Sequence, residues 1–198
     1  MSYKDSIIGT AMALFAENGF KDTSTADIAK SIGSAESTLF HHFKNKEELL
    51  LKILERVQRD IVREVESHLH DAEPENGLAM ISGIVGLFFH LSEAKRVEFL
   101  LLFRNYPYQL ANVNPTCRKI IESIYDFFLG IIAEALIKGQ QDGSIREVNV
   151  QKQAMVILAM ITGLTRFDIF GIMTLAGYHQ EIIDSCQRML CREYICED

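Results

Sequence analysis

The segment from Gly19 to Leu50 constrains the fold of this chain more than any other stretch of the sequence. Thr23 and Ser24 supply hydroxyl oxygens that can cap a helix over residues 25–32, where apolar residues recur at helical spacing. Gly33 follows at once, and glycine is the residue that most readily ends a helix in a tight turn. The pattern predicts a short helix followed by a sharp change of chain direction.

Further helices are expected on both sides of this turn. The helix before it has an apolar stripe at i, i+4, i+7 and i+8, formed by Ile7, Ala11, Leu14 and Phe15. That first helix is expected to end at Asn18-Gly19, a short one to run from about Ala35 to Phe43, and a long one from Asn45 to about His70. Asn45, with Glu48 three residues later, resembles a capping box with asparagine as the cap.

The rest of the chain shows helical periodicity, and no segment sustains the alternation of a strand. The further helices are expected over Leu78–Leu91, Lys95–Arg104, Thr116–Lys138, Val150–Leu175 and Tyr178–Cys196. Segments rich in turn residues are expected to be loops, namely Asp71–Gly77, Asn105–Pro115 and Gly139–Gly143. The predicted fold is all-α, with an N-terminal head of three helices, residues 1–46, and a larger helical body, residues 47–198.

The charge of the chain does not by itself suggest nucleic-acid binding. The 198 residues carry a formal net charge of −7. Residues 1–46 contain as many acidic as basic side chains, so the whole excess of negative charge lies in the body. A neutral head still binds DNA when its lysines face the same way, because affinity depends on local contacts with phosphates. Net charge therefore neither supports nor excludes a DNA-binding function.

The cysteines and the apolar segments indicate a soluble, cytoplasmic protein. The four cysteines form no CxxC pair, and no secretory leader precedes the first helix. The longest apolar runs stop short of a membrane span, since charged residues such as Glu134 and Arg166 interrupt or end them. We therefore expect reduced thiols and no membrane partner.

The third predicted helix has an apolar face and a polar face. Leu39 and Phe43 lie four residues apart and can anchor it, as a helix-turn-helix requires of the helix that enters the major groove. The opposite face carries short or planar hydrogen-bonding side chains, the kinds that reach base edges and phosphates: Glu36, Ser37, Thr38, His41 and His42. Lys46 adds a positive charge beside the N–H groups of the next helix, which favours contact with a phosphate. The head is therefore predicted to read DNA.

In its order of residues the head resembles the tetracycline-repressor (TetR) family of bacterial regulators. The matching elements are Thr23-Ser24, Ile28-Ala29, Gly33, Thr38-Leu39-Phe40-His41-His42-Phe43 and Lys46-Glu47. The resemblance implies a homodimer that binds double-stranded operator DNA and responds to a small-molecule effector, usually as a repressor released from a palindromic site. It also implies DNA contacts at Thr23, Ser24, Ser34, Glu36, Ser37, Thr38, Phe40, His41, His42 and Lys46.

Three departures from the family pattern bear on DNA recognition. The family usually has Val-Ser before the recognition helix, where this chain has Ser34-Ala35. Glu36 is repelled by phosphates, although its carboxylate can accept a hydrogen bond from the amino group of cytosine. Phe40 replaces a frequent tyrosine and lacks the hydroxyl that would bond a phosphate. We therefore expect an operator sequence or affinity that differs from the usual ones of the family.

The body contains many large aromatic and flexible side chains, most of which a hydrophobic core and a dimer interface account for. The family resemblance implies in addition a ligand cavity among the middle helices. The candidate lining residues are Phe89, Phe103, Arg104, Tyr125, Phe128 and Phe167. Such a wall favours a small apolar or aromatic effector with an acidic group for an arginine to bind.

The last two predicted helices are apolar on more than one face. Their apolar positions include Ala154, Ile157, Leu158 and Ile161 on the first and Ile182, Cys186, Met189 and Leu190 on the second. Two such helices from each of two subunits can form a four-helix interface of a homodimer. A two-fold dimer also places paired recognition helices in successive major grooves of a palindromic site.

Two other classes of function remain open from the residues alone. One is a ligand-binding or scaffolding protein whose degenerate head no longer reads DNA, an alternative suggested by the neutral head and by Glu36. The other is a small enzyme, but the sequence has no local Ser/His/Asp, Cys/His or phosphate-binding glycine motif, so we predict no catalytic residues and no cofactor. No metal site is predicted either, because His41 and His42 are adjacent and point about 100° apart on a helix.

Overall fold

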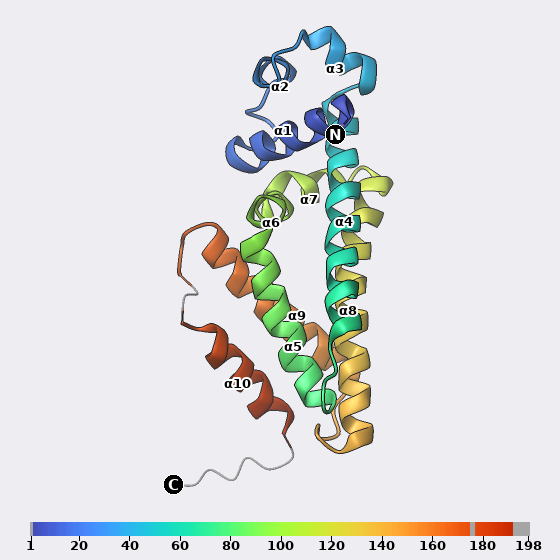
Figure 1. Cartoon of the computed structure of the whole chain (residues 1–198), viewed down its shortest axis with the longest axis vertical. Helices are drawn as coiled ribbons and strands as arrows, with labels where there is room; N and C mark the ends of the chain where they lie inside the picture. Colours follow the sequence, from blue (N-terminus) through green and yellow to red (C-terminus); the bar gives the residue numbers. More distant parts are fainter. Residues whose placement is uncertain (1, 175–176, 192–198) are drawn as a thin grey trace. The chain divides into compact units, whose positions relative to one another are not determined.

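The computed structural model describes residues 2–174 and 177–191. In this part of the chain it contains ten helices and no strand, so the predicted all-α fold is confirmed. The helices (Figure 1) are α1 (Tyr3–Asn18), α2 (Thr25–Ser31), α3 (Glu36–His42), α4 (Lys46–Asp71), α5 (Gly77–Ala94), α6 (Arg96–Phe103), α7 (Asn105–Ala111), α8 (Pro115–Asp142), α9 (Val150–Ile169) and α10 (His179–Leu190).

The chain divides into two compact units, each built from two separate stretches of sequence. The first unit comprises Met1–Arg63 and Lys95–Ile124, and the second comprises Glu64–Ala94 and Tyr125–Asp198. The two longest helices, α4 and α8, each continue from one unit into the other. The helices of the predicted head therefore share their unit with α6, α7 and the first part of α8, which lie far along the sequence.

In the first unit, α1 packs against α2 and α6, and α2 packs against α3. Ser24 caps α2 as predicted, because Ser24 Oγ accepts a hydrogen bond from Asp27 N at 3.0 Å and Asp27 Oδ2 accepts one from Ser24 N at 2.9 Å. These hydrogen bonds lower the pKa of the Asp27 carboxyl. Before α4, Asn45 Oδ1 accepts a bond from Glu48 N at 2.8 Å, whereas the Glu48 carboxylate binds the backbone N–H of Lys44.

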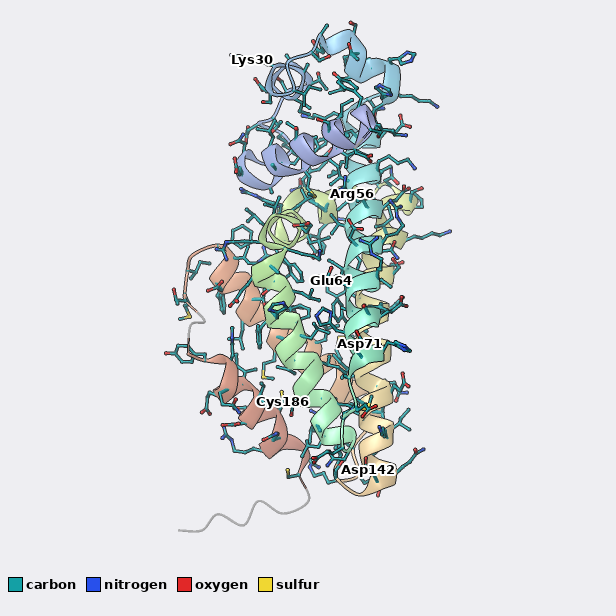
Figure 2. The ribbon with its side chains drawn as sticks, viewed as in Figure 1. Lys30, Arg56, Glu64, Asp71, Asp142 and Cys186 are labelled. Carbon is teal, nitrogen blue, oxygen red and sulfur yellow. The ribbon has the colours of Figure 1, made fainter. Side chains whose placement is uncertain are left out.

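In the second unit, α5 packs against α9 and α10. Its first residue, Gly77, lies so close to α8 that a Cβ atom there would stand 2.1 Å from the backbone nitrogen of Gly139. Gly77 N donates a hydrogen bond to Asp142 Oδ2 at 2.7 Å, and Leu78 N donates one to Ser144 Oγ at 3.2 Å. Asp142 is the last residue of α8 (Figure 2), and Ser144 lies two residues beyond it. The end of α8 and the turn after it thus satisfy two N–H groups that the start of α5 leaves unpaired.

Two of the predicted loops are largely helical. The segment Asn105–Pro115 contains α7, in which Pro107 is the third residue. A proline in the first turn costs little, because its missing N–H has no partner within the helix. The segment Gly139–Gly143 is helical as far as Asp142, and Gly143 then ends α8 with a φ of 81°. Both loop predictions are wrong, because proline and glycine near helix ends resemble the residues of a loop.

The two C-terminal helices are shorter than predicted. α9 ends at Ile169 rather than Leu175, and Gly171 takes the φ of 67° with which the chain turns away. α10 ends at Leu190, since Cys191 is not helical, and the rest of the predicted helix, residues 192–196, lies outside the described residues.

Among the described residues, α5 is the helix that is long and apolar enough to cross a membrane, with a mean hydropathy of 1.5 over 18 residues. The sequence reading did not single it out. Within the second unit α5 buries eight residues, among them Ile81, Val85 and Phe88. A core helix that packs on two neighbours has the same composition, so composition alone does not separate the two cases.

Candidate nucleic-acid interface

Backbone hydrogen bonds close the turn between α2 and α3. Gly33 N donates to Lys30 O at 3.1 Å, and Ser34 N donates to Ala29 O at 2.9 Å. Gly33 has a φ of 67°, a left-handed conformation that strains any residue with a Cβ atom. The glycine that marks the turn in the sequence thus fixes the direction in which the chain leaves α2.

α3 has one buried face and one exposed face, as predicted. Leu39 is fully buried, and Phe43, which follows the helix, is 2% exposed, so both anchor α3 to its unit. Phe40 is 48% exposed. The exposed side chains of α3 are Glu36, Ser37, Phe40 and His41, and the partly exposed ones are Thr38 and His42. The helix therefore presents hydroxyl and imidazole groups and one aromatic ring to solvent.

The start of α3 has no side-chain cap. Ala35 occupies the cap position, and Ser34 Oγ donates to Ala35 O at 3.3 Å instead of accepting a bond from the helix. The Glu36 carboxylate accepts a hydrogen bond from Thr25 Oγ1. Glu36 thereby connects the first turn of α3 to the first turn of α2, a link that the sequence did not indicate.

Thr23 and Ser24 stabilise the head from within. Thr23 is 1% exposed, and its Oγ1 donates to Gly19 O at 2.9 Å and to Leu14 O at 3.2 Å. Ser24 is exposed, and its Oγ donates to Asp27 Oδ2 at 2.6 Å while it caps α2. A hydroxyl as buried as that of Thr23 holds the turn after α1 and is not available at the surface for DNA.

The ammonium group of Lys46 is engaged inside the head. Nζ donates to Phe20 O at 2.8 Å and to Thr23 O at 2.9 Å, and it lies 4.4 Å from the centre of the Phe20 ring. Burial lowers the pKa of Lys46, and the Asp22 carboxylate opposes that shift. The sequence suggested a phosphate contact, whereas this charge ties the turn between α1 and α2 to α4. Lys44, directly before α4, is exposed.

A second support of the head comes from the junction of α6 and α7. The Arg104 side chain donates from Nε and Nη2 to Ala16 O, at 2.9 and 2.7 Å, and from Nη2 to Glu17 O at 2.5 Å. These carbonyl groups belong to the last turn of α1, where helix geometry leaves them without an N–H partner. A cation at this end also offsets the negative pole of the helix dipole.

Tyr106 adds two contacts next to this junction. Its ring stacks on that of Phe20, with the centroids 3.9 Å apart and an interplanar angle of 12°. Its hydroxyl donates to Glu47 Oε1 at 3.0 Å. Burial, together with the Glu47 carboxylate, raises the pKa of Tyr106 to about 12. Sequence reasoning missed Tyr106 because its partners are distant along the chain.

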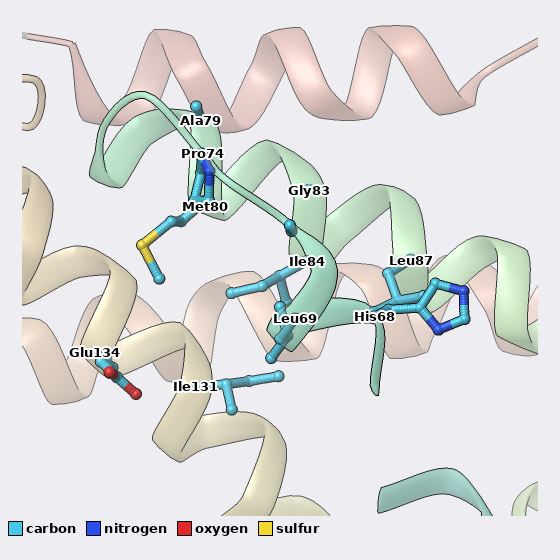
Figure 3. Close-up of a pocket in the computed structure, with 11 residues that line it drawn as sticks. His68, Leu69, Pro74, Ala79, Met80, Gly83, Ile84, Leu87, Ile131 and Glu134 are labelled. Atoms are coloured by element: carbon cyan, nitrogen blue, oxygen red, sulfur yellow. The ribbon is translucent and has the colours of Figure 1, made fainter. Parts of the chain in front are cut away.

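The second unit contains a cavity of about 370 Å³, lined by residues from the end of α4, from α5 and from α8 (Figure 3). Its walls are mostly apolar, and its polar lining residues are His68 and Glu134. The apolar side chains of the wall include Leu69, Met80, Ile84, Leu87 and Ile131. Cavities of this size and character hold small molecules. The described part of the chain has no cluster of three or more His, Cys, Asp or Glu side chains suited to a metal ion.

The six ligand contacts expected from the sequence all lie outside the lining of this cavity: Phe89, Phe103, Arg104, Tyr125, Phe128 and Phe167. Phe103 and Arg104 belong to the first unit, where Arg104 binds α1. Phe89 and Phe128 are buried in the second unit, and Phe167 is 42% exposed on α9. Aromatic residues in a core and aromatic residues in a pocket wall give the same sequence pattern, which is why the pattern did not locate the cavity.

A sequence model of bacterial regulatory proteins of the tetR family matches residues 7–53. The match covers most of α1, all of α2 and α3, and the beginning of α4. It therefore includes the exposed face of α3 but none of the residues that line the cavity.

Similarity to two regulators and one solved structure extends the comparison. The fatty acid metabolism regulator protein of Bacillus subtilis (strain 168) is 28% identical over 142 residues, which are 71% of this chain and 70% of that protein. The HTH-type transcriptional regulator QacR of Staphylococcus aureus strain Mu50 is 46% identical over 54 residues, 27% of this chain and 29% of QacR. A Saccharomonospora viridis protein solved in complex with choline matches with a TM-score of 0.81 at 23% identity, over 96% of this chain and 98% of that one. At that identity the structural match indicates a shared fold.

Proposed function

Because this chain is a ligand-responsive DNA-binding regulator of the TetR family, we propose that it acts as a cytoplasmic, homodimeric repressor that a small molecule releases from a palindromic operator. The observation that carries the proposal is the exposed face of α3, from which Ser37 and His41 project while Leu39 anchors the helix. A helix held in this way enters the major groove with its outer face toward the bases.

The candidates on α3 divide by their chemistry. Ser37, Thr38 and His41 have donors and acceptors that match base edges, and the exposed ring of Phe40 suits contact with a thymine methyl group. Ser24, Ser34, Glu36 and His42 complete the set of surface contacts. Thr23 and Lys46 contribute by holding the turn that positions these helices, because their polar groups already bind backbone carbonyls.

Dimerisation through the two C-terminal helices is supported by exposed apolar side chains on α9. Met155 is 54% exposed and Val156 is 50% exposed, and Phe167 lies three turns further along the same helix. The apolar positions expected from the sequence are different, since Ile157 and Ile161 are buried within the second unit. An exposed apolar stripe of this kind is stabilised when a second copy covers it.

Solution mass tests this interface directly. Met155→Glu is expected to shift the purified protein from dimer to monomer in sedimentation equilibrium, because it places a charge on the covered stripe. Gln109→Glu, at an exposed position of α7 in the first unit, adds the same charge outside α9 and is the matched control, expected to remain dimeric. A wild-type protein that is monomeric at micromolar concentration would contradict the proposed dimer.

We assign the effector site to the cavity of the second unit. The names of the similar proteins, a fatty acid metabolism regulator and a protein in complex with choline, support a small organic effector. His68 and Leu69, near the end of α4, line the cavity, while Lys46 at the start of the same helix binds the head. A ligand that favours one position of α4 would thereby favour one spacing of the two recognition helices in the dimer.

Selection of genomic fragments by the purified full-length protein tests the DNA-binding function. We expect retention of a fragment with an inverted repeat and protection of two half-sites about one helical turn, or a multiple of it, apart. Affinity should fall with rising salt, since phosphate contacts release counterions. A folded protein that retains no fragment would instead support a ligand-binding or scaffolding protein whose head does not read DNA.

A further inference from the structure

The cavity of the second unit has apolar walls and a polar side chain at each end. Figure 3 shows His68 and Leu87 at one end and Met80 and Glu134 at the other. Of the described residues that line the cavity, none is lysine or arginine. A carboxylate is therefore the charged group that a ligand meets there.

Both polar side chains of the lining accept hydrogen bonds. His68 Nδ1 lies 2.8 Å from Glu64 O, and because a carbonyl oxygen only accepts, this ring nitrogen carries the hydrogen. The other nitrogen, Nε2, then presents a lone pair when the ring is neutral. The Glu134 carboxylate also offers only acceptors. A ligand that satisfies both ends has to supply hydrogen-bond donors.

The surroundings of the cavity add further negative charge. Residues 71–75 contribute Ala72 and Pro74 to the wall, and this segment carries three exposed carboxylates, those of Asp71, Glu73 and Glu75. A positive charge also lies nearby, since the exposed Lys138 is one turn beyond Glu134 on α8. This charge acts on another carboxylate, because it helps to lower the pKa of Asp142. The field at the cavity therefore favours positive charge.

We propose that the effector of this cavity is an apolar molecule with a cationic, hydrogen-bond-donating end group that lies against Glu134. The inference rests on the proposed function, because it names the ligand class of the same site. An acidic end group, as expected from the sequence, would meet a like charge at Glu134 and find no cation in the described lining. A cationic end group gains a charge-assisted hydrogen bond, and burial of the apolar part of the ligand removes apolar surface from water.

Three ligands with the same decyl tail isolate the contribution of the ligand's end group to the binding affinity. Calorimetric titration of the full-length protein, without DNA and below micellar concentrations, would compare decylammonium, decanol and decanoate. We expect decylammonium to bind about 10-fold or more tightly than decanol, and decanoate to bind more weakly than decanol. Decanoate that binds as tightly as decylammonium would overturn the proposal, and so would a failure of all three ligands to bind.

Two variants and a control locate the preference. Glu134→Gln, at an exposed position that tolerates the change, is expected to bring the three affinities within about threefold of one another. Asp126→Asn removes an exposed carboxylate on the same helix, outside the cavity lining, and should keep the preference. Gly83→Leu should weaken all three ligands about 10-fold or more by filling the cavity, since a Cβ there meets no heavy atom within 4 Å. A preference that survives in Glu134→Gln, or binding unchanged in Gly83→Leu, would contradict the assignment.

Failure of this inference can be told apart from failure of the proposed function. Retention of genomic fragments without ligand does not require an occupied cavity, whereas the calorimetric preference is measured without DNA. A protein that binds no DNA yet prefers decylammonium contradicts only the proposed function. A protein that binds its operator yet prefers decanoate contradicts only the ligand class.

Discussion

Arg104 and Ala16 are joined by two hydrogen bonds, in which Nε and Nη2 of one guanidinium donate to one carbonyl oxygen at 2.9 and 2.7 Å. Ala16 lies in the last turn of α1, and Arg104 lies between α6 and α7, 88 residues along the chain. The family match ends at residue 53, so the helices that identify the family are stabilised by a residue outside the matching segment. The head is therefore not independent of the chain that follows it.

Replacement of Arg104 by methionine should lower the free energy of unfolding by about 1–3 kcal/mol, because it leaves helix-end carbonyl groups without their charged donor. Urea unfolding followed by circular dichroism measures the change. Arg63→Met is the matched control, since the Arg63 side chain is 77% exposed and its ion pair with Asp60 should contribute less than about 1 kcal/mol. Equal effects of the two substitutions would contradict a supporting role for Arg104.

Substitution of Lys46 should change the stability of the protein, whereas substitution of Lys44 should change its affinity for DNA. Lys46→Met removes the donor to Phe20 O and Thr23 O and should destabilise the protein by about 1–3 kcal/mol. We propose that the exposed ammonium of Lys44 contacts a DNA phosphate. Lys44→Met should therefore leave stability unchanged, lower operator affinity and reduce the slope of log affinity against log salt concentration by about one. Thermal unfolding and affinity titrations at several salt concentrations measure both effects. An unchanged melting temperature in Lys46→Met would show that its hydrogen bonds do not hold the turn.

Tyr106 should make the stability of the protein depend on alkaline pH. Its pKa is raised from 10.0 to about 12 in the folded head, so the folded state keeps a proton that the unfolded chain loses. This stabilisation is complete below pH 10 and is lost as the pH rises through about 12. Denaturant unfolding across this range should show a steeper loss of stability in the wild type than in Tyr106→Phe. Parallel curves for the two proteins would contradict the assignment.

The sequence predicts those parts of the head that depend on neighbouring residues. Ser24 caps α2 through Asp27, three residues away, and Gly33 turns the chain through its own backbone conformation. The two faces of α3 follow from the spacing of Leu39 and Phe43. Each of these features is local, and a periodic or capping pattern records it directly.

The remaining features depend on tertiary contacts that no local pattern records. Lys46 has the charge of a phosphate-binding residue, but its Nζ atom is taken up by carbonyl groups of a distant turn. Arg104 has the chemistry of a ligand contact, yet α1 provides its partners. The cavity is an absence of side chains between helices, and its charged lining residue, Glu134, lies in an ordinary helical stretch.

Gly77 should be intolerant of any side chain. Gly77→Ala is expected to lower the free energy of unfolding by about 3 kcal/mol, because its Cβ would meet the backbone of α8 at Gly139 and Ala135. Gly130→Ala is the control, since a Cβ at Gly130 meets nothing within 4 Å, and it should stabilise α8 by about 1 kcal/mol. Chemical denaturation of both variants measures the difference. Similar stability of the two would contradict the close approach of α5 to α8.

Operator affinity of α3 variants tests the central claim most directly. Fluorescence anisotropy with the selected operator would compare the wild type with Ser37→Ala, His41→Ala and the control Val113→Ala, whose residue is 80% exposed in the segment between α7 and α8. We predict a loss of about 1–3 kcal/mol of binding free energy for each α3 variant, with weaker discrimination among operator bases, and no change for Val113→Ala. Equal affinity and equal discrimination in all four proteins would contradict the reading of DNA by the exposed face of α3.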